Sequence, residues 1–147
     1  MDPRKVNTHM VKHYLQDTED NILHFMTQQH FKQTILLPYN TELVLFYFNL
    51  TKCTIIVYDS MDTKKSTFAA IFAVIDRAWD RFRASVREQW KERLDRGSLI
   101  FQRCAKQKKG TNLCGYCVRD YMHAIADESS KEHKSTVRIK HSYINYV

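Results

Sequence analysis

The stretch that decides the fold is LVLFYFNLTKCTIIVY, which runs from Leu43 to Tyr58. Two runs within it, Leu43–Phe48 and Thr54–Tyr58, are rich in Val, Ile, Phe and Tyr and therefore predict β-strands. The intervening Asn49–Lys52 has the length of a hairpin turn, which predicts that the two strands pair antiparallel. Because both runs are continuously apolar, we expect the sheet to be covered on both faces.

Residues before this hairpin predict further elements. Apolar residues at helical spacing over Val6–Phe31, interrupted around Asp17–Asp20, predict one or two short helices. Thr34–Leu37 is a short apolar run stopped by Pro38, which predicts a third strand.

The residues after the hairpin change to a helical period. Apolar side chains recur every three or four positions over Phe68–Leu94, which predicts one long amphipathic helix or two in series. Ser66 or Thr67 is the expected N-cap and Gly97 the expected stop. The polar face of this helix mixes Arg and Lys with acidic residues, so we expect it to be solvated rather than to bind nucleic acid.

The C-terminal third predicts a strand, a loop and a helix. Leu99–Cys104 has strand composition, and Ala105–Asn112 is a polar loop. A helix is expected to begin at or just after Cys114 and to end near Ala126. Residues 127–147 are predicted to form a polar tail.

The composition indicates a globular protein with a single domain over residues 1–147, because 44% of the residues are hydrophobic and only 3 are Gly and 2 Pro. The net charge of +7 suits an acidic partner, yet it is also common in ordinary basic proteins. No apolar run approaches the roughly 18 residues of a membrane span. Met1–Asp20 lacks the apolar stretch of a signal peptide. We expect an intracellular protein, nuclear or cytoplasmic, with no membrane partner.

Four cysteines, Cys53, Cys104, Cys114 and Cys117, are expected to be reduced thiols. Cys114 and Cys117 also form a C-x-x-C pattern, which redox dithiols and zinc half-sites share. A thioredoxin-like domain needs a proline-bearing strand downstream, whereas both prolines lie upstream. A zinc site needs four ligands, and no second C-x-x-C is present. We therefore expect two separate thiols, no metal and no cofactor.

The segment with the clearest chemistry is QKKGTNLCGYCV, Gln107–Val118. A cysteine in the first turn of a helix faces unpaired backbone N–H groups and the positive end of the helix dipole, which favour the thiolate. Gly110 allows a tight loop, and Gln107 can donate its side-chain amide to a developing oxyanion. Cys114 thus suits a nucleophile, although an inert cysteine buried at a helix start has the same pattern.

A strand ending in VYDS (Val57–Ser60), a long helix, a strand and then QKKGTNLCGY (Gln107–Tyr116) follow one another in the chain. This order resembles the SUMO-deconjugating cysteine peptidases, the ubiquitin-like-protein-specific proteases, and most closely their plant, transposon-borne branch. The resemblance covers about residues 35–125. It implies an α+β, papain-like fold in which a small, mostly antiparallel sheet packs against the Cys114 helix, with the Phe68–Leu94 helix outside.

The resemblance also implies roles for single residues, because the family orders its catalytic residues His, Asp, Gln, Cys. Asp59 is then the residue that orients the histidine, Gln107 the oxyanion donor and Cys114 the nucleophile. The implied partner is SUMO or another ubiquitin-like protein.

The histidine of the family is missing at its position. An ungapped alignment on Asp59 places Glu42 and Leu43 where the family has His-Trp, and only 41 residues precede Glu42. None of the seven histidines lies on that strand, and His30 is the nearest before it. We expect a truncated catalytic domain with one of two functions. It is a cysteine peptidase impaired by loss of its base, or an inactive relative that binds a ubiquitin-like protein without cleaving it.

Overall fold

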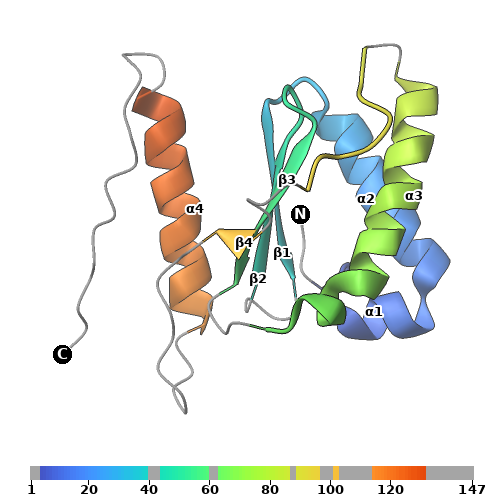
Figure 1. The fold of residues 1–147 in the computed structure, drawn as a ribbon, viewed down its shortest axis with the longest axis horizontal. Coiled ribbons are helices and arrows are strands. Elements are labelled where there is room, and N and C mark those ends of the chain that lie inside the picture. The colour runs from blue at the N-terminus through green and yellow to red at the C-terminus, as the bar shows by residue number, and fades with distance from the viewer. Residues whose placement is uncertain are drawn as a thin grey trace.

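The computed structural model describes residues 4–39, 44–59, 63–86, 89–96, 101–102 and 114–131. Its strands form one small sheet, and its helices lie on either side of that sheet (Figure 1). In chain order the elements are α1 (Thr8–His13), α2 (Leu15–Gln29), β1 (Thr34–Tyr39), β2 (Val44–Asn49), β3 (Thr54–Asp59), the 3-10 helix η1 (Lys65–Phe68), α3 (Ala69–Ser85), β4 (Phe101–Gln102) and α4 (Cys114–Lys131).

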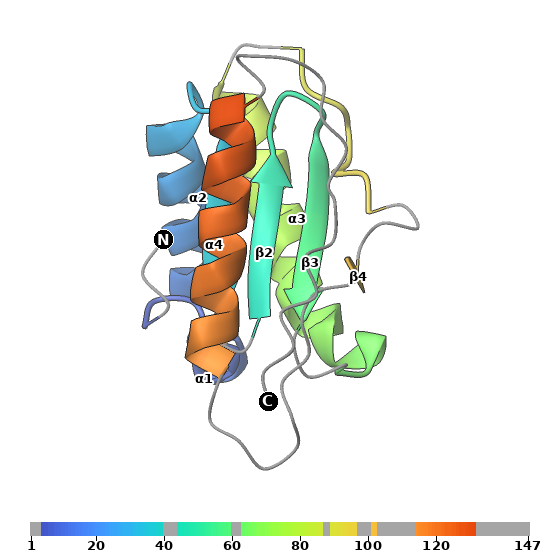
Figure 2. The same cartoon turned by 90° about the vertical axis from the view of Figure 1, so that its left-hand side faces the viewer.

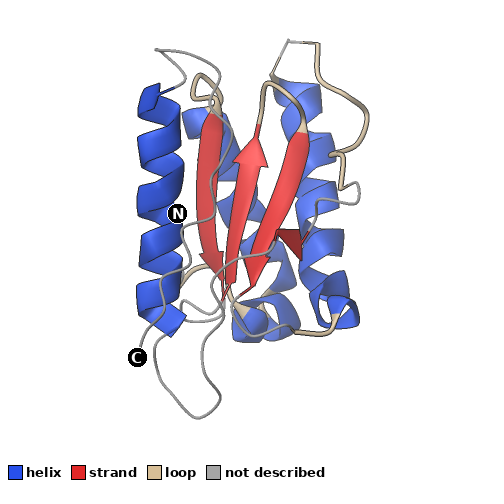
Figure 3. Cartoon of the chain, turned by 60° about the vertical axis from the view of Figure 1, so that its left-hand side comes forward, coloured by secondary structure: helices blue, strands red, loops and turns tan. Residues whose placement is uncertain are grey.

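The sheet has the order β1-β2-β3-β4 (Figure 3). The predicted hairpin is present: β2 pairs antiparallel with β3, from Val44 opposite Asp59 to Asn49 opposite Thr54. β1 pairs antiparallel with the other side of β2, and β4 pairs parallel with β3. As an edge strand, β1 tolerates Pro38, which cannot donate to a ladder. The predicted α+β class with a small, mostly antiparallel sheet is confirmed.

The hairpin turn is closed by local hydrogen bonds. The side chain of Asn49 accepts from the Lys52 N–H at 2.9 Å, and the Cys53 N–H donates to the Leu50 carbonyl at 3.0 Å. Cys53 follows the turn with a φ of 50°, in the left-handed region that residues other than glycine rarely adopt. Its free thiol is buried, as a small apolar side chain commonly is.

Helices cover both faces of the sheet (Figure 1, Figure 2). α1, α2 and α3 lie on one face and form the larger apolar cluster with it. α4 lies on the other face, where Val118, Tyr121 and Ile125 pack with Leu45 of β2. The prediction that the hairpin is covered on both faces is confirmed for β2, whose first three residues are no more than 2% exposed.

The predicted helix over Phe68–Leu94 is wrong in extent, because α3 ends at Ser85 and Val86 is extended. The apolar period continues beyond the helix because the chain returns along α3. The Trp90 ring lies 5.8 Å from that of Trp79 and 5.4 Å from that of Phe82. Trp90 is therefore covered by α3, although Trp90 itself does not lie in a helix.

The predicted position and termini of this helix also need correction. α3 does not lie outside the sheet layer, because one of its faces supplies seven buried residues, Ile71, Phe72, Val74, Ile75, Ala78, Trp79 and Phe82. Neither Ser66 nor Thr67 caps it: both lie in η1, and the N-cap of α3 is Phe68, which makes no capping bond. Gly97, beyond the end of the helix, is outside the described residues.

The expected break around Asp17–Asp20 is also wrong. The N-terminal helices separate at Tyr14, which has φ −135° and ψ 54°, and Asp17–Asp20 lie within α2. The charged Glu19 is accommodated at a buried position, 5% exposed, because its side chain points at α3. Its two carboxylate oxygens accept hydrogen bonds at 2.8 Å from Arg77 and from Arg81. An ion pair thus joins α2 to α3 at the position where the sequence predicted a break in the helix.

The C-terminal helix begins at Cys114, as predicted, but runs to Lys131. Residues 127–131 of the predicted tail are therefore helical, and residues 132–147 lie outside the described residues. The described part of the predicted strand over Leu99–Cys104 is limited to Phe101–Gln102.

We predict that Glu19→Gln lowers the free energy of unfolding by about 1–2 kcal/mol, because it removes the charge that Arg77 and Arg81 bond. Burial raises the pKa of Glu19, but the two guanidinium groups outweigh burial and hold it below its usual 4.5. The charged form is thus stabilised on folding, and this contribution is lost as the pH falls below about 4.5. Urea unfolding at about pH 7 and about pH 3.5 measures both effects, since the variant loses less stability between them.

Asp80→Asn is the matched control. It breaks an ion pair with Arg83 in which the Asp80 side chain is 65% exposed. Such exposed pairs contribute about 0.5 kcal/mol or less. Equal losses for the two variants would contradict a special role of Glu19.

Candidate functional site

Asp59 lies at the end of β3, opposite Val44, the first residue of β2. It is 3% exposed. Its Oδ2 atom accepts a hydrogen bond from the backbone N–H of Thr63. The structure therefore assigns this carboxylate at least one structural contact, at the end of the sheet where β2 begins.

The N-terminus of α4 lies at the same end of the sheet (Figure 1, Figure 2). Tyr121 of α4 stacks on Tyr58, the residue before Asp59, with ring centroids 5.6 Å apart and an interplanar angle of 28°. Cys114 precedes Tyr121 by seven residues, about 10 Å of helix rise toward that end. Three backbone positions thus share one end of the fold: the start of β2, the end of β3 with Asp59, and the start of α4 with Cys114.

Other parts of the predicted site cannot be placed. Glu42, two residues before β2, and Gln107 lie outside the described residues. The side chains of Cys114 and Cys117 are likewise not described, although both residues belong to α4. The catalytic roles of these residues stay predictions.

His30 does not lie near Asp59. It caps the C-terminus of α2, four residues before β1 begins at Thr34. Asp59 is level with the other end of β1, because Val44 pairs with both Asp59 and Tyr39. The six residues of β1 span about 17 Å. Replacement of the missing base by His30 is therefore disfavoured.

The basic face predicted for the long helix is largely ion-paired. Arg77 and Arg81 bond Glu19, Arg81 also bonds Asp20, and Arg83 bonds Asp80. Paired guanidinium groups offer less charge to a phosphate backbone. This arrangement agrees with a solvated helix face.

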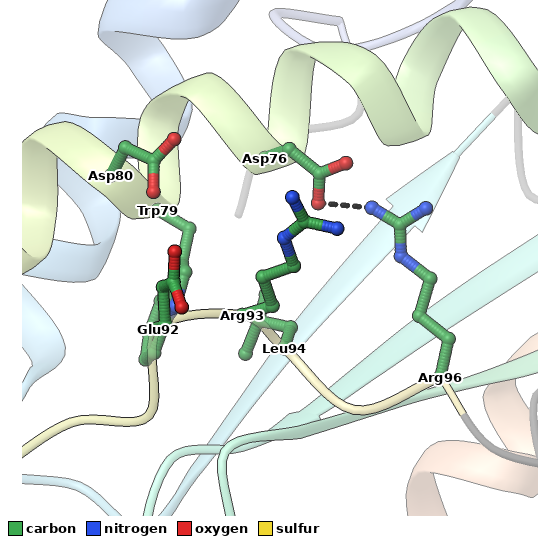
Figure 4. A pocket seen from close by; sticks show the side chains of 7 residues that line it. All are labelled: Asp76, Trp79, Asp80, Glu92, Arg93, Leu94 and Arg96. Carbon is green, nitrogen blue, oxygen red and sulfur yellow. Dashed lines mark hydrogen bonds and ion pairs between the residues drawn. The ribbon is translucent and has the colours of Figure 1, made fainter.

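A cavity of about 500 Å³ lies between α3 and residues 89–96 (Figure 4). It is lined by carboxylates, arginines and two apolar side chains: Asp76, Trp79, Asp80, Glu92, Arg93, Leu94 and Arg96. Arg96 bonds Asp76, and its guanidinium lies 4.4 Å from the centroid of the Phe72 ring. None of the predicted site residues lines this cavity. The ion pair between Arg96 and Asp76 joins the returning chain to α3.

The described residues contain no group of three or more His, Cys, Asp and Glu side chains placed to hold a metal ion. No helix among them is long and apolar enough to cross a membrane.

Comparison with protein-family models, with curated proteins and with solved structures finds no match to this chain. Function is therefore inferred from the motifs of the sequence and from the end of the sheet that Asp59 and α4 define.

We predict that Asp59→Ala destabilises the chain by about 1–2 kcal/mol, because the N–H of Thr63 loses its acceptor. Asp59→Asn keeps a side-chain oxygen and should cost less than half as much. Urea unfolding of both variants measures this. Equal losses would show that the charge of Asp59, rather than its hydrogen bond, stabilises the folded chain.

Proposed function

We propose that this chain is a degenerate relative of the ubiquitin-like-protein-specific cysteine peptidases, with a papain-like fold and Cys114 as its nucleophile. The observation that carries the proposal is the common location of the start of α4 and the buried Asp59 at one end of the sheet. The sequence supports it independently, through the Gln107–Tyr116 segment and the VYDS strand end.

The helix start at Cys114 supplies the first requirement of thiol chemistry. The backbone N–H groups of a first helical turn have no partner within the helix, and they stabilise a negative charge there. A thiolate at Cys114 would attack the carbonyl carbon of the C-terminal glycine of a ubiquitin-like protein. Gln107 would donate its amide to the oxyanion of the tetrahedral intermediate. Collapse of that intermediate breaks the C–N bond and leaves a thioester on Cys114.

Collapse of the intermediate and hydrolysis of the thioester both need proton transfers that this chain supplies poorly. The leaving amine must be protonated, and water must later be deprotonated to hydrolyse the thioester. Histidine does both near neutral pH because its pKa lies close by. Carboxylic acids are ordinarily ionised near neutral pH, so a Glu in place of the histidine is a poor choice of acid. We infer that Cys114 can still attack a substrate covalently even though turnover is slow or absent.

Binding without cleavage is the second candidate function. Replacement of the base by Glu42 favours it, because a scaffold that only binds needs no base. Both candidates use the same partner, SUMO or another ubiquitin-like protein, in the nucleus or cytoplasm. They differ in whether Cys114 reacts.

We predict that a SUMO probe with an electrophilic C-terminus, such as a propargylamide, forms a covalent adduct with the chain. Such a probe needs a thiolate but no leaving-group proton, so the missing histidine matters least. Intact-mass spectrometry should show one added probe, absent in Cys114→Ala and retained in Cys117→Ala. Binding of SUMO without any adduct would favour the second candidate. Neither binding nor an adduct would refute both.

We also predict that the chain hydrolyses a SUMO precursor at a rate reduced on the order of 10⁴-fold from that of a complete triad. The double variant Glu42→His with Leu43→Trp should regain part of it, since it restores the family's His-Trp at the strand. Release of the precursor's C-terminal peptide measures turnover, with Cys114→Ala added to the double variant as the matched control.

Robust turnover by the unmodified chain, lost in Cys114→Ala, would show that another residue supplies the base. The alignment at Glu42 would then be wrong, while the assignment of Cys114 would stand.

A further inference from the structure

We propose that His9 and His13 of α1 form a binding site for a divalent first-row transition-metal ion, of the class of Zn²⁺ and Cu²⁺. The two histidines are four residues apart on one helix. Residues at this spacing lie on the same face, one turn apart, which is how metalloprotease helices present two imidazoles to zinc. The site is independent of the proposed peptidase function.

The ring geometry fits two imidazoles on one ion. The ring centroids of His9 and His13 are 4.7 Å apart, with planes inclined by 40°. A metal–nitrogen bond of about 2.0–2.1 Å places the ion about 3.2 Å from each ring centroid. Two rings bound at an angle of about 90–110° then have centroids about 4.5–5.2 Å apart. The observed separation lies within this range before any ion is added.

Both imidazoles are accessible and available. The two side chains are exposed. Neither forms a hydrogen bond or ion pair with any residue in the described part of the chain, and the other close ring is Tyr14, 5.8 Å from His9. Water can complete the coordination, since the site is open to solvent. Imidazole nitrogen suits zinc and copper, whereas magnesium prefers oxygen.

α1 has only six residues and is anchored by the buried Val11 and by its two caps. The Asn7 side chain accepts from the Met10 N–H at 3.0 Å at its start, and the Tyr14 N–H bonds the Met10 carbonyl at its end. An ion that joins His9 to His13 would fix this turn and stabilise the folded chain by mass action. Sequence reasoning missed this site, although the spacing His-x-x-x-His was visible.

The test is isothermal titration of the untagged chain, carrying Cys104→Ser, Cys114→Ser and Cys117→Ser to remove competing thiols, with ZnCl₂ and with CuCl₂ in a buffer free of chelators. We expect one tight ion per chain, with copper tighter than zinc, and no binding of MgCl₂. His9→Ala and His13→Ala should each weaken binding at least tenfold, because a single imidazole loses the chelate. Lys12→Ala, on the same helix but not a ligand, should retain it.

A second readout needs no variant. Paramagnetic Cu²⁺ at substoichiometric amounts should broaden the ring-proton NMR signals of His9 and His13 before those of His24 and His30. Binding that survives the double variant His9→Ala with His13→Ala, or broadening that begins at other histidines, would overturn the proposal. Absence of Zn²⁺ and Cu²⁺ binding would do so as well.

Discussion

The arrangement of this protein depends on the burial of β2 from both sides. Val44, Leu45 and Phe46 are consecutive, and none is more than 2% exposed. Successive side chains of a strand point to opposite faces, so both faces of the sheet need a covering layer. α1, α2 and α3 cover one face and α4 the other. The position of α4, and with it the helix start at Cys114, follows from the need to cover Leu45.

The sequence predicted the elements that depend on local composition. The β2–β3 hairpin and the start of α4 were correct because apolar runs and turn residues act over a few positions. The end of α3 was wrong for a physical reason. The returning chain packs the partly buried Trp90 on Trp79 and Phe82. An apolar residue beyond Ser85 is thus covered although its backbone is not helical.

The other differences arise from pairing between distant residues. Glu19 resembles a solvated residue in the sequence, and its burial depends on Arg77 and Arg81, which lie 58 and 62 positions further along the chain. The charge pattern of α2 alone gives no sign of this. From the sequence, the candidate site could be predicted only as a motif, because the relative positions of Asp59 and α4 depend on the fold. The structure adds that Asp59 and the start of α4 share one end of the sheet, while His30 lies near the other.

The contacts that hold the fold are separate from the thiol chemistry proposed for Cys114. The described core consists of apolar residues of the sheet and helices, and among the predicted catalytic residues only Asp59 is buried within the described part. Asp59 has a structural use there, because it accepts the Thr63 N–H. The thiolate proposed at Cys114 would depend on the first turn of α4. α4 is held on β2 by Val118, Tyr121 and Ile125, which follow that turn. On this proposal, a chain built this way can lose turnover while it keeps its fold and a reactive cysteine.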